Sequence, residues 1–141
     1  MIHVEPYRAK HLHALDLQEG QKYIGPNLTP EHAKELEGVH AITVLNDGRV
    51  LAVAGIIEVW PGRAFIWSYI DQQAGQHMVA IHRVAQRMVA GYEGSRLEAD
   101  VDLDFEPGHR WMTMLGFKLE TACMPKYRPD GGAMSKYVRI R

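Results

Sequence analysis

The sequence predicts a mixed α+β fold in which helices flank one twisted, mostly antiparallel sheet. Three segments with the residue preferences of strands follow one another near the middle of the chain, and segments with helical spacing stand on both sides of them. At 141 residues, 46% of them hydrophobic, the chain is long enough to form one core. No repeat or linker-like tract divides it, so we expect a single domain over residues 1–141.

The first elements are expected to be short. His3–Tyr7 should be extended, and the leucine spacing within Ala9–Leu17 allows a helix. Gln18–Leu28 contains two Gly, a Pro and an Asn, which predicts a loop. Thr29 and the Pro after it predict a helix start, because the hydroxyl can accept from a backbone N–H and Pro suits the first helical position. This helix should end near Gly38.

Three antiparallel strands should follow. Val39–Leu45 and Arg49–Trp60 are rich in Val, Ile and Leu, and Asn46-Asp47-Gly48 between them tolerates positive φ, which predicts a hairpin. A Pro-Gly turn then leads into a third strand, Ala64–Ile70. Gly55 inside the second strand indicates a bulge or a close approach of another group to the backbone.

The second half should form two helices and three strands. Apolar residues at helical spacing begin at Met78, and residues 91–95 should end this long helix. Leu97–Phe105 alternates apolar and acidic residues, which predicts a strand with an acidic face. Pro107–Leu115 should form a short helix closed by Gly116. The last two strands should be Phe117–Met124 and Ala133–Ile140.

The connection between the third strand and the long helix is the most informative segment. A strand that enters a helix through a glycine-containing loop leaves unpaired N–H groups at the helix N-terminus, where the helix dipole also attracts anions. The loop around Gly75 could therefore hold a diphosphate. The alternative is that Gly75 only makes the turn.

With this loop, the element order resembles that of the Gcn5-related N-acetyltransferase (GNAT) family. That family binds acetyl-CoA at a loop of pattern Gln/Arg-x-x-Gly-x-Gly/Ala that opens its main helix. This chain has Gln72 and Gly75 at the corresponding positions and His77 at the last, small position.

A second motif carries the same resemblance. A short helix ends in Leu115-Gly116-Phe117, and Met112 stands four residues before the Gly, where family members often have a Tyr that protonates the departing CoA thiolate. The form His109-Arg110-Trp111 before this motif also looks like small phage-encoded members of the fold, some of which are internal virion proteins.

The resemblance implies that acetyl-CoA is the cosubstrate. It would lie in a cleft where the third strand and the strand after the long helix splay apart. Its diphosphate would meet the N–H groups of Gly75, Gln76 and His77, with Gln72 opening the loop. Its pantetheine arm would pair with the backbone. The two residues expected to pair with that arm are Tyr69 and Ile70.

Transfer to an amine requires a group that takes up a proton. A lysine-like amine with a pKa of about 10.4 is protonated at pH 7 and must lose a proton before it attacks a thioester. Glu58 is the candidate base, because burial beside Trp60 would make it more basic; a solvated carboxylate at a sheet edge is the alternative. Tyr69 is the candidate acid. Further carboxylates that could serve are Asp71, Asp102 and Asp104.

Several other classes are disfavoured. The Asp100-x-Asp102-x-Asp104 pattern lacks the Gly and Glu of a calcium loop, so it indicates a solvated strand face or a surface that attracts a cationic amine. The eight histidines and the lone Cys123 lack zinc-ligand spacing, so we expect no metal. A net charge of −1 argues against nucleic-acid binding, and no apolar stretch reaches the length of a membrane span.

Three functions therefore remain open. The first is an N-acetyltransferase acting on a primary amine of a small molecule or protein, and the second is a non-catalytic phage virion or host-interaction protein of the same fold. The third is a binding module for another acyl-CoA. The absence of an export signal predicts a cytoplasmic protein, in the host cytoplasm or the virion if a phage encodes it. Strand edges left by the meander and the terminal hairpin favour a homodimer.

Overall fold

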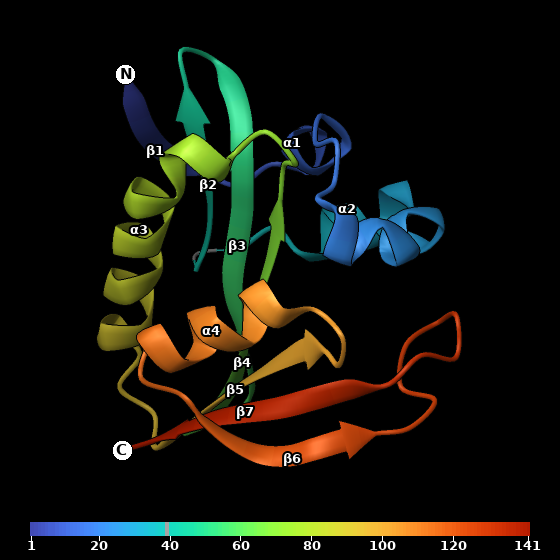
Figure 1. The fold of residues 1–141 in the computed structure, drawn as a ribbon. Helices are drawn as coiled ribbons and strands as arrows, with labels where there is room; N and C mark the ends of the chain where they lie inside the picture. The colour runs from blue at the N-terminus through green and yellow to red at the C-terminus, as the bar shows by residue number, and fades with distance from the viewer. Residues whose placement is uncertain (39) are drawn as a thin grey trace. The chain divides into compact units, whose positions relative to one another are not determined.

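The computed structural model describes residues 1–38 and 40–141, and its element order is the predicted one (Figure 1). Val39, where the strand Val39–Leu45 was expected to begin, lies outside the described residues. The strands are β1 (Ile2–Pro6), β2 (Ala41–Asn46), β3 (Arg49–Trp60), β4 (Arg63–Ile70), β5 (Arg96–Asp102), β6 (Lys118–Met124) and β7 (Met134–Ile140). The helices are α1 (Ala9–His13), α2 (Pro30–Glu35), α3 (Met78–Gly91) and α4 (Glu106–Met114), with the 3₁₀ helices η1 (Glu19–Asn27) and η2 (Gly75–His77).

The strands form one sheet by hydrogen bonding, in the order β1-β2-β3-β4-β5-β7-β6. β1 with β2, β2 with β3, β5 with β7 and β6 with β7 pair antiparallel. β4 and β5 pair parallel, over Arg63–Phe65 and Arg96–Glu98. The expected α+β class with a mostly antiparallel sheet is therefore confirmed. In the described part of the chain, every helix is too short or too polar to cross a membrane.

The chain divides into two compact units. Unit 1 comprises Met1–Ile56 and Trp67–Arg83, and unit 2 comprises Ile57–Ile66 and Val84–Arg141. β3, β4 and α3 each contribute residues to both units. Whether residues 1–141 behave as one folding domain stays a prediction.

In unit 1, α1 and α2 lie on one side of the sheet and the start of α3 lies on the other (Figure 1). Its turns and caps follow the sequence prediction. The hairpin turn places Asp47 at φ 48° and Gly48 at φ 83°. The Thr29 hydroxyl accepts from the His32 N–H at 3.2 Å. The Tyr7 hydroxyl donates to the Ala33 carbonyl at 2.8 Å and so attaches α2 to the end of β1.

Three predicted boundaries differ from the structure. The helix expected to reach Leu17 ends at His13, because Leu17 forms an antiparallel bridge with Asp71 instead. The predicted loop Gln18–Leu28 contains η1, since 3₁₀ turns need no apolar repeat and tolerate the Gly and Pro present there. The strand expected to reach Phe105 ends at Asp102, where the chain turns into α4.

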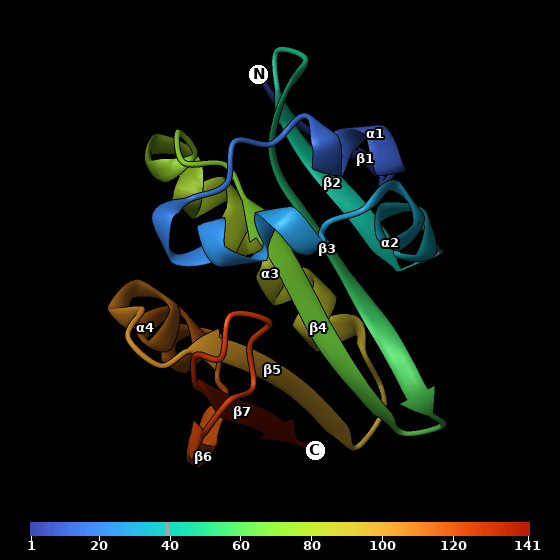
Figure 2. The same ribbon diagram turned by 90° about the vertical axis from the view of Figure 1, so that its right-hand side faces the viewer.

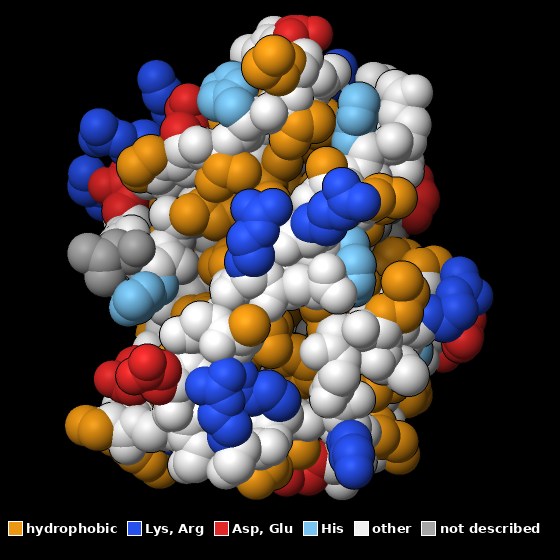
Figure 3. Space-filling view, turned by 90° about the vertical axis from the view of Figure 1, so that its left-hand side faces the viewer, with side chains coloured by type: hydrophobic (Ala, Val, Ile, Leu, Met, Phe, Trp, Pro, Cys, Tyr) orange, Lys and Arg blue, Asp and Glu red, His pale blue; other side chains and the backbone are white. Residues whose placement is uncertain are grey.

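The face on the α3 side carries a mixture of residue types. Figure 3 shows this face, on which Lys and Arg side chains alternate with apolar and polar surface.

The opposite side of α3 is buried. Its buried residues are Ile81, Ala85 and Val89, which confirms the helical spacing, whereas Gln86 and Arg87 are exposed.

In unit 2, hydrogen bonds from Arg139 and Arg141 hold the end of α3. Arg139 of β7 donates to the carbonyls of Val89 at 2.6 Å and Gly94 at 2.9 Å. Arg141 donates to the carbonyl of Ala90 at 2.9 Å. Carbonyls in the last turn of a helix lack partners within the helix, so these guanidinium groups satisfy those of Val89 and Ala90.

Candidate functional site

The loop between β4 and α3 is held by the carboxylate of Asp71. This side chain is buried; its Oδ1 accepts from the Asp16 N–H at 2.8 Å, and its Oδ2 accepts from the Gln73 N–H at 3.0 Å and from Arg49 at 2.9 Å. Burial alone would raise the pKa of Asp71, but these hydrogen bonds hold it below its ordinary value. A carboxylate engaged in this way suits the positioning of the loop better than the uptake of a proton.

Two backbone donors of the loop are available. Over residues 1–38 and 40–141, the N–H groups of Gly75 and Gln76 have no hydrogen-bond partner. The His77 N–H, the third donor expected from the sequence, donates to the Ala74 carbonyl at 2.8 Å. Gly75 and Gln76 are exposed, so their N–H groups can reach an anion at the beginning of η2.

Neither the turn nor the packing requires Gly75 to be glycine. Its φ is not positive, and a Cβ built there meets no atom within 4 Å. The alternative in which Gly75 only makes the turn therefore gains no support from its backbone. The open space where its side chain would lie is compatible with a ligand that approaches the backbone closely.

Gln72 connects the loop to the segment after α1. Its N–H donates to the Asp16 carbonyl at 2.8 Å, and its side-chain amide donates to the Asp16 carboxylate. The side chain is exposed but already engaged, so its role in this structure is to fix the loop.

The end of β4 carries the other two residues of the predicted binding site. Burial raises the pKa of Tyr69, which keeps its hydroxyl protonated, and its ring lies 5.8 Å from that of Trp67. The Ile70 N–H donates to Gln21 Oε1 at 3.0 Å, and the Ile70 carbonyl accepts from the Gln18 N–H at 2.9 Å. The groups of Ile70 expected to meet a pantetheine arm are thus occupied by η1 and the residue before it.

Glu58, the candidate base, lies in unit 2 and is exposed. Its Oε2 accepts from the Tyr92 hydroxyl at 3.0 Å and from the Gly62 N–H at 3.3 Å. Trp60 is 58% exposed and its ring lies 4.7 Å from the Arg63 guanidinium. The expectation that Trp60 buries Glu58 is wrong, because this end of β3 is open to solvent; the catalytic role itself stays a prediction.

Met112, at the position where the family motif often has Tyr, is a core residue of α4. It is 8% exposed, and its carbonyl accepts from the Phe117 N–H at 3.0 Å. A thioether has no proton to donate. The residue therefore packs the short helix and supplies no acid.

Cationic side chains form ion pairs with the carboxylates of β5. Glu98 is buried, and its carboxylate contacts Arg63 at 2.5 Å, Arg96 at 2.8 Å and Lys136 at 3.3 Å. The Arg63 guanidinium, with Arg96 and Lys136, lowers the pKa of Glu98 from 4.5 to about 2. Asp102 forms an ion pair with Arg128. Asp100 and Asp104, two residues of the predicted solvated face, are exposed, whereas Glu98 on the same predicted strand is buried. An amine attracted to this face would compete with these cations.

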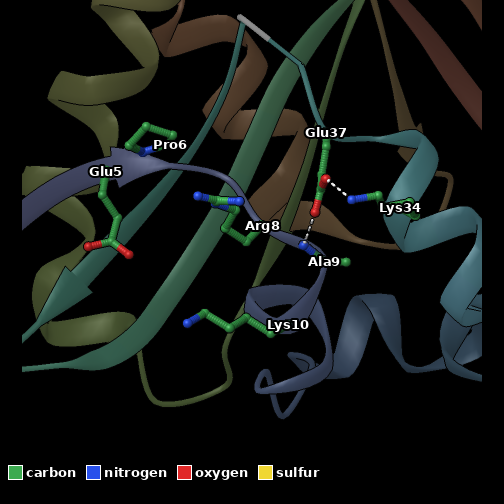
Figure 4. Close-up of a pocket in the computed structure, with 7 residues that line it drawn as sticks. All are labelled: Glu5, Pro6, Arg8, Ala9, Lys10, Lys34 and Glu37. Atoms are coloured by element: carbon green, nitrogen blue, oxygen red, sulfur yellow. Dashed lines mark hydrogen bonds and ion pairs between the residues drawn. The ribbon is translucent and has the colours of Figure 1, made fainter.

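A depression in unit 1 lies apart from the predicted residues (Figure 4). The Glu37 carboxylate accepts from the Ala9 N–H at 2.8 Å and from Lys34 at 2.8 Å, as the dashed lines in Figure 4 mark. These bonds attach α2 to the start of α1. The lining residues are Glu5, Pro6, Arg8, Ala9, Lys10, Lys34 and Glu37.

Asp16, Gln18 and Gln21 were not predicted to contact the end of β4 and the loop after it, but they do. All three lie between α1 and the end of η1: Asp16 belongs to the segment Ala9–Leu17, where a helix was expected, and the two glutamines belong to the predicted loop. The sole signal is the spacing of two glutamines three residues apart, which places them on one side of a 3₁₀ turn.

Solved structures of acetyltransferases share this fold. A GCN5-related N-acetyltransferase from Kribbella flavida aligns with a TM-score of 0.73 at 20% identity, over 99% of this chain and 98% of that one. The ribosomal-protein-S18-alanine N-acetyltransferase from Escherichia coli aligns with a TM-score of 0.72 at 13% identity, over 99% and 94%. A GNAT-family acetyltransferase from Bacillus anthracis gives 0.70 at 15% identity, over 99% and 94%.

Comparisons of the sequence alone find no match. No family model matches the chain, and no curated protein matches it in sequence. At these identities the structural likeness concerns the fold, which is that of the GNAT acetyltransferases.

Proposed function

We propose that the protein is an N-acetyltransferase that transfers the acetyl group of acetyl-CoA to a primary amine of a small molecule or protein. The observation that carries the proposal is the pair of unpartnered, exposed N–H groups at Gly75 and Gln76, in the loop where the resemblance puts a diphosphate. Neither the backbone conformation nor the packing requires a glycine at position 75, and the missing side chain leaves room for the diphosphate. The shared fold supports the same assignment.

In this reaction the amine nitrogen attacks the thioester carbonyl carbon, the C–N bond forms, the C–S bond breaks and CoA leaves as a thiolate. The nitrogen loses a proton, which the exposed carboxylate of Glu58 can accept through water. Tyr69, kept protonated by its raised pKa, is the candidate donor to the leaving sulfur. A thiol with a pKa of about 8.5 also leaves without an acid, so Met112 is no obstacle to turnover.

Binding is tested by thermal unfolding with increasing acetyl-CoA and CoA. Ligand at about a hundred times Kd should add roughly 2.7 kcal/mol of stability. Gly75→Asp should abolish this effect, because a negative side chain would stand where the diphosphate binds. Gly91→Asp is the matched control, since a Cβ at Gly91 also meets no atom within 4 Å. An unchanged melting temperature at millimolar ligand, or normal binding by Gly75→Asp, would refute the proposed site.

The second candidate is a non-catalytic protein of the same fold, such as a phage virion or host-interaction protein. The observation that favours it is buried Met112 at the position of the family's acid. Thiol release with polyamines, aminoglycosides, amino acids and lysine peptides separates the two candidates. Binding of acetyl-CoA with no release above background hydrolysis would support the non-catalytic protein.

We also infer a cytoplasmic location, or the virion if a phage encodes the chain, and a homodimer. Support for the dimer comes from β6, which is an edge strand of the sheet and is exposed along nearly all its length. Light scattering that gave a mass near 16.0 kDa across micromolar concentrations would exclude the dimer.

A further inference from the structure

The first turn of η1 and the residue before it are hydrogen-bonded to the end of β4. Gln21 Nε2 donates to the Ser68 carbonyl at 2.7 Å, and Gln21 Oε1 accepts from the Ile70 N–H at 3.0 Å. The Gln18 N–H donates to the Ile70 carbonyl at 2.9 Å. In Figure 2 this segment, drawn in blue, crosses in front of the upper end of β4.

These bonds lie on the edge of β4 that β3 does not use. The Asp71 N–H donates to the Leu51 carbonyl of β3 at 2.9 Å. Backbone groups of successive residues in a strand point to opposite edges, so the groups of Ile70, and those of Ser68 two residues earlier, point away from β3. Gln21 therefore occupies the edge at which a further strand or an extended ligand could pair with β4.

The Gln21 side chain pairs with β4 as a backbone amide would. Its donor and acceptor span the carbonyl of Ser68 and the N–H of Ile70, the two groups that an added strand also engages. Gln18 Nε2 donates to the same Gln21 Oε1 at 3.1 Å, which fixes the orientation of the amide. Two amides cannot hold these groups at once, so an amide-bearing ligand that pairs here must displace Gln21.

We propose that Gln21 sets the affinity of the protein for CoA by competing with the pantetheine amides for Ser68 and Ile70. This inference rests on the proposed function. In the structure Gln21 closes this edge of β4. Ligand binding turns the Gln21 side chain out and releases Gln18 from Ile70. Breaking the hydrogen bonds of Gln21 and Gln18 uses part of the binding free energy. The protein therefore binds CoA more weakly than it would if this edge of β4 were already open.

The test compares Kd values for CoA between the parent protein and Gln21→Met, which keeps a side chain of similar length without the amide. A neutral hydrogen bond contributes about a two- to ten-fold factor, so the loss of two should tighten CoA binding about five-fold or more. Gln21→Ala should shift Kd in the same direction. Gln86→Ala, at an exposed position of α3, is the control and should leave Kd unchanged.

A second ligand separates competition from general loosening. Adenosine 3′,5′-bisphosphate lacks the pantetheine amides, so its Kd should be the same for the parent and Gln21→Met. Unchanged or weaker CoA binding in both Gln21 variants would overturn the inference and leave the proposed function standing. An equal gain for both ligands would also overturn it. No CoA binding by any variant would refute the proposed function and the competition together, whereas binding by the Gln21 variants alone would support both.

Discussion

Neutralising Glu98 should cost a large part of the stability of unit 2. The carboxylate is buried among Arg63, Arg96 and Lys136, which hold its pKa at about 2 against an ordinary 4.5. At about 1.36 kcal/mol for each pH unit, this difference corresponds to about 3 kcal/mol of folding free energy at pH 7. Glu98→Gln keeps the shape but leaves three cations without their shared anion, so we expect a loss of about 3 kcal/mol.

Urea denaturation of the parent and Glu98→Gln over a range of pH measures this loss. A lowered pKa stabilises the folded state fully above pH 4.5, and the stabilisation disappears as pH falls toward 2, so the gap between the two proteins should shrink to less than half by about pH 3. Glu120→Gln is the control: Glu120 also contacts Arg96 but is exposed, so its replacement should lower the stability much less than Glu98→Gln does. Equal losses in the two variants, or a gap independent of pH, would refute the reasoning.

Three further predictions concern packing, acid stability and turnover. Gly55→Ala should lower the free energy of unfolding by about 1–3 kcal/mol, because the new Cβ would lie 2.7 Å from the Trp67 ring; an unchanged urea midpoint would contradict this. Burial lowers the pKa of His11 below 6.5, so stability should fall as pH drops below 6.5, and His11→Asn should lose this dependence in the same assay. If the protein catalyses acetyl transfer, the rate of thiol release should rise from pH about 6 to about 9 without a falling limb. A falling limb in that range would indicate a catalytic acid. Glu58→Gln should lower kcat and leave the affinity for CoA unchanged.

Local signals in the sequence were sufficient for the order of elements. The turn at Asp47 and Gly48 and the cap at Thr29 depend on residues within a few positions of one another, and both take the expected form. Gly55 marked a close approach to the backbone, and the structure identifies the approaching group as the Trp67 ring. These features follow from local steric and hydrogen-bonding preferences, which a single sequence contains.

Contacts between distant segments could not be read in the same way. Alternation along β5 predicted the acidic side of the strand but not the burial of Glu98. The partners of Glu98 come from β4, β5 and β7, and only strand pairing brings them together. Likewise, nothing near Gln21 in the sequence indicates that its amide pairs with β4, 47 residues away at Ser68. The sequence therefore singled out the β4–α3 loop as a candidate site, but not the side chain that pairs with the strand before it.

The guanidinium groups that close the end of α3 couple two events in folding. Until β7 is paired, Arg139 and Arg141 cannot reach the carbonyls of Val89, Ala90 and Gly94, and the last turn of the helix must rely on water. Helix end and final strand should therefore open and close as one cooperative segment, with similar amide exchange rates in both. β7 thus completes the end of a helix whose Val89 precedes Arg139 by 50 residues.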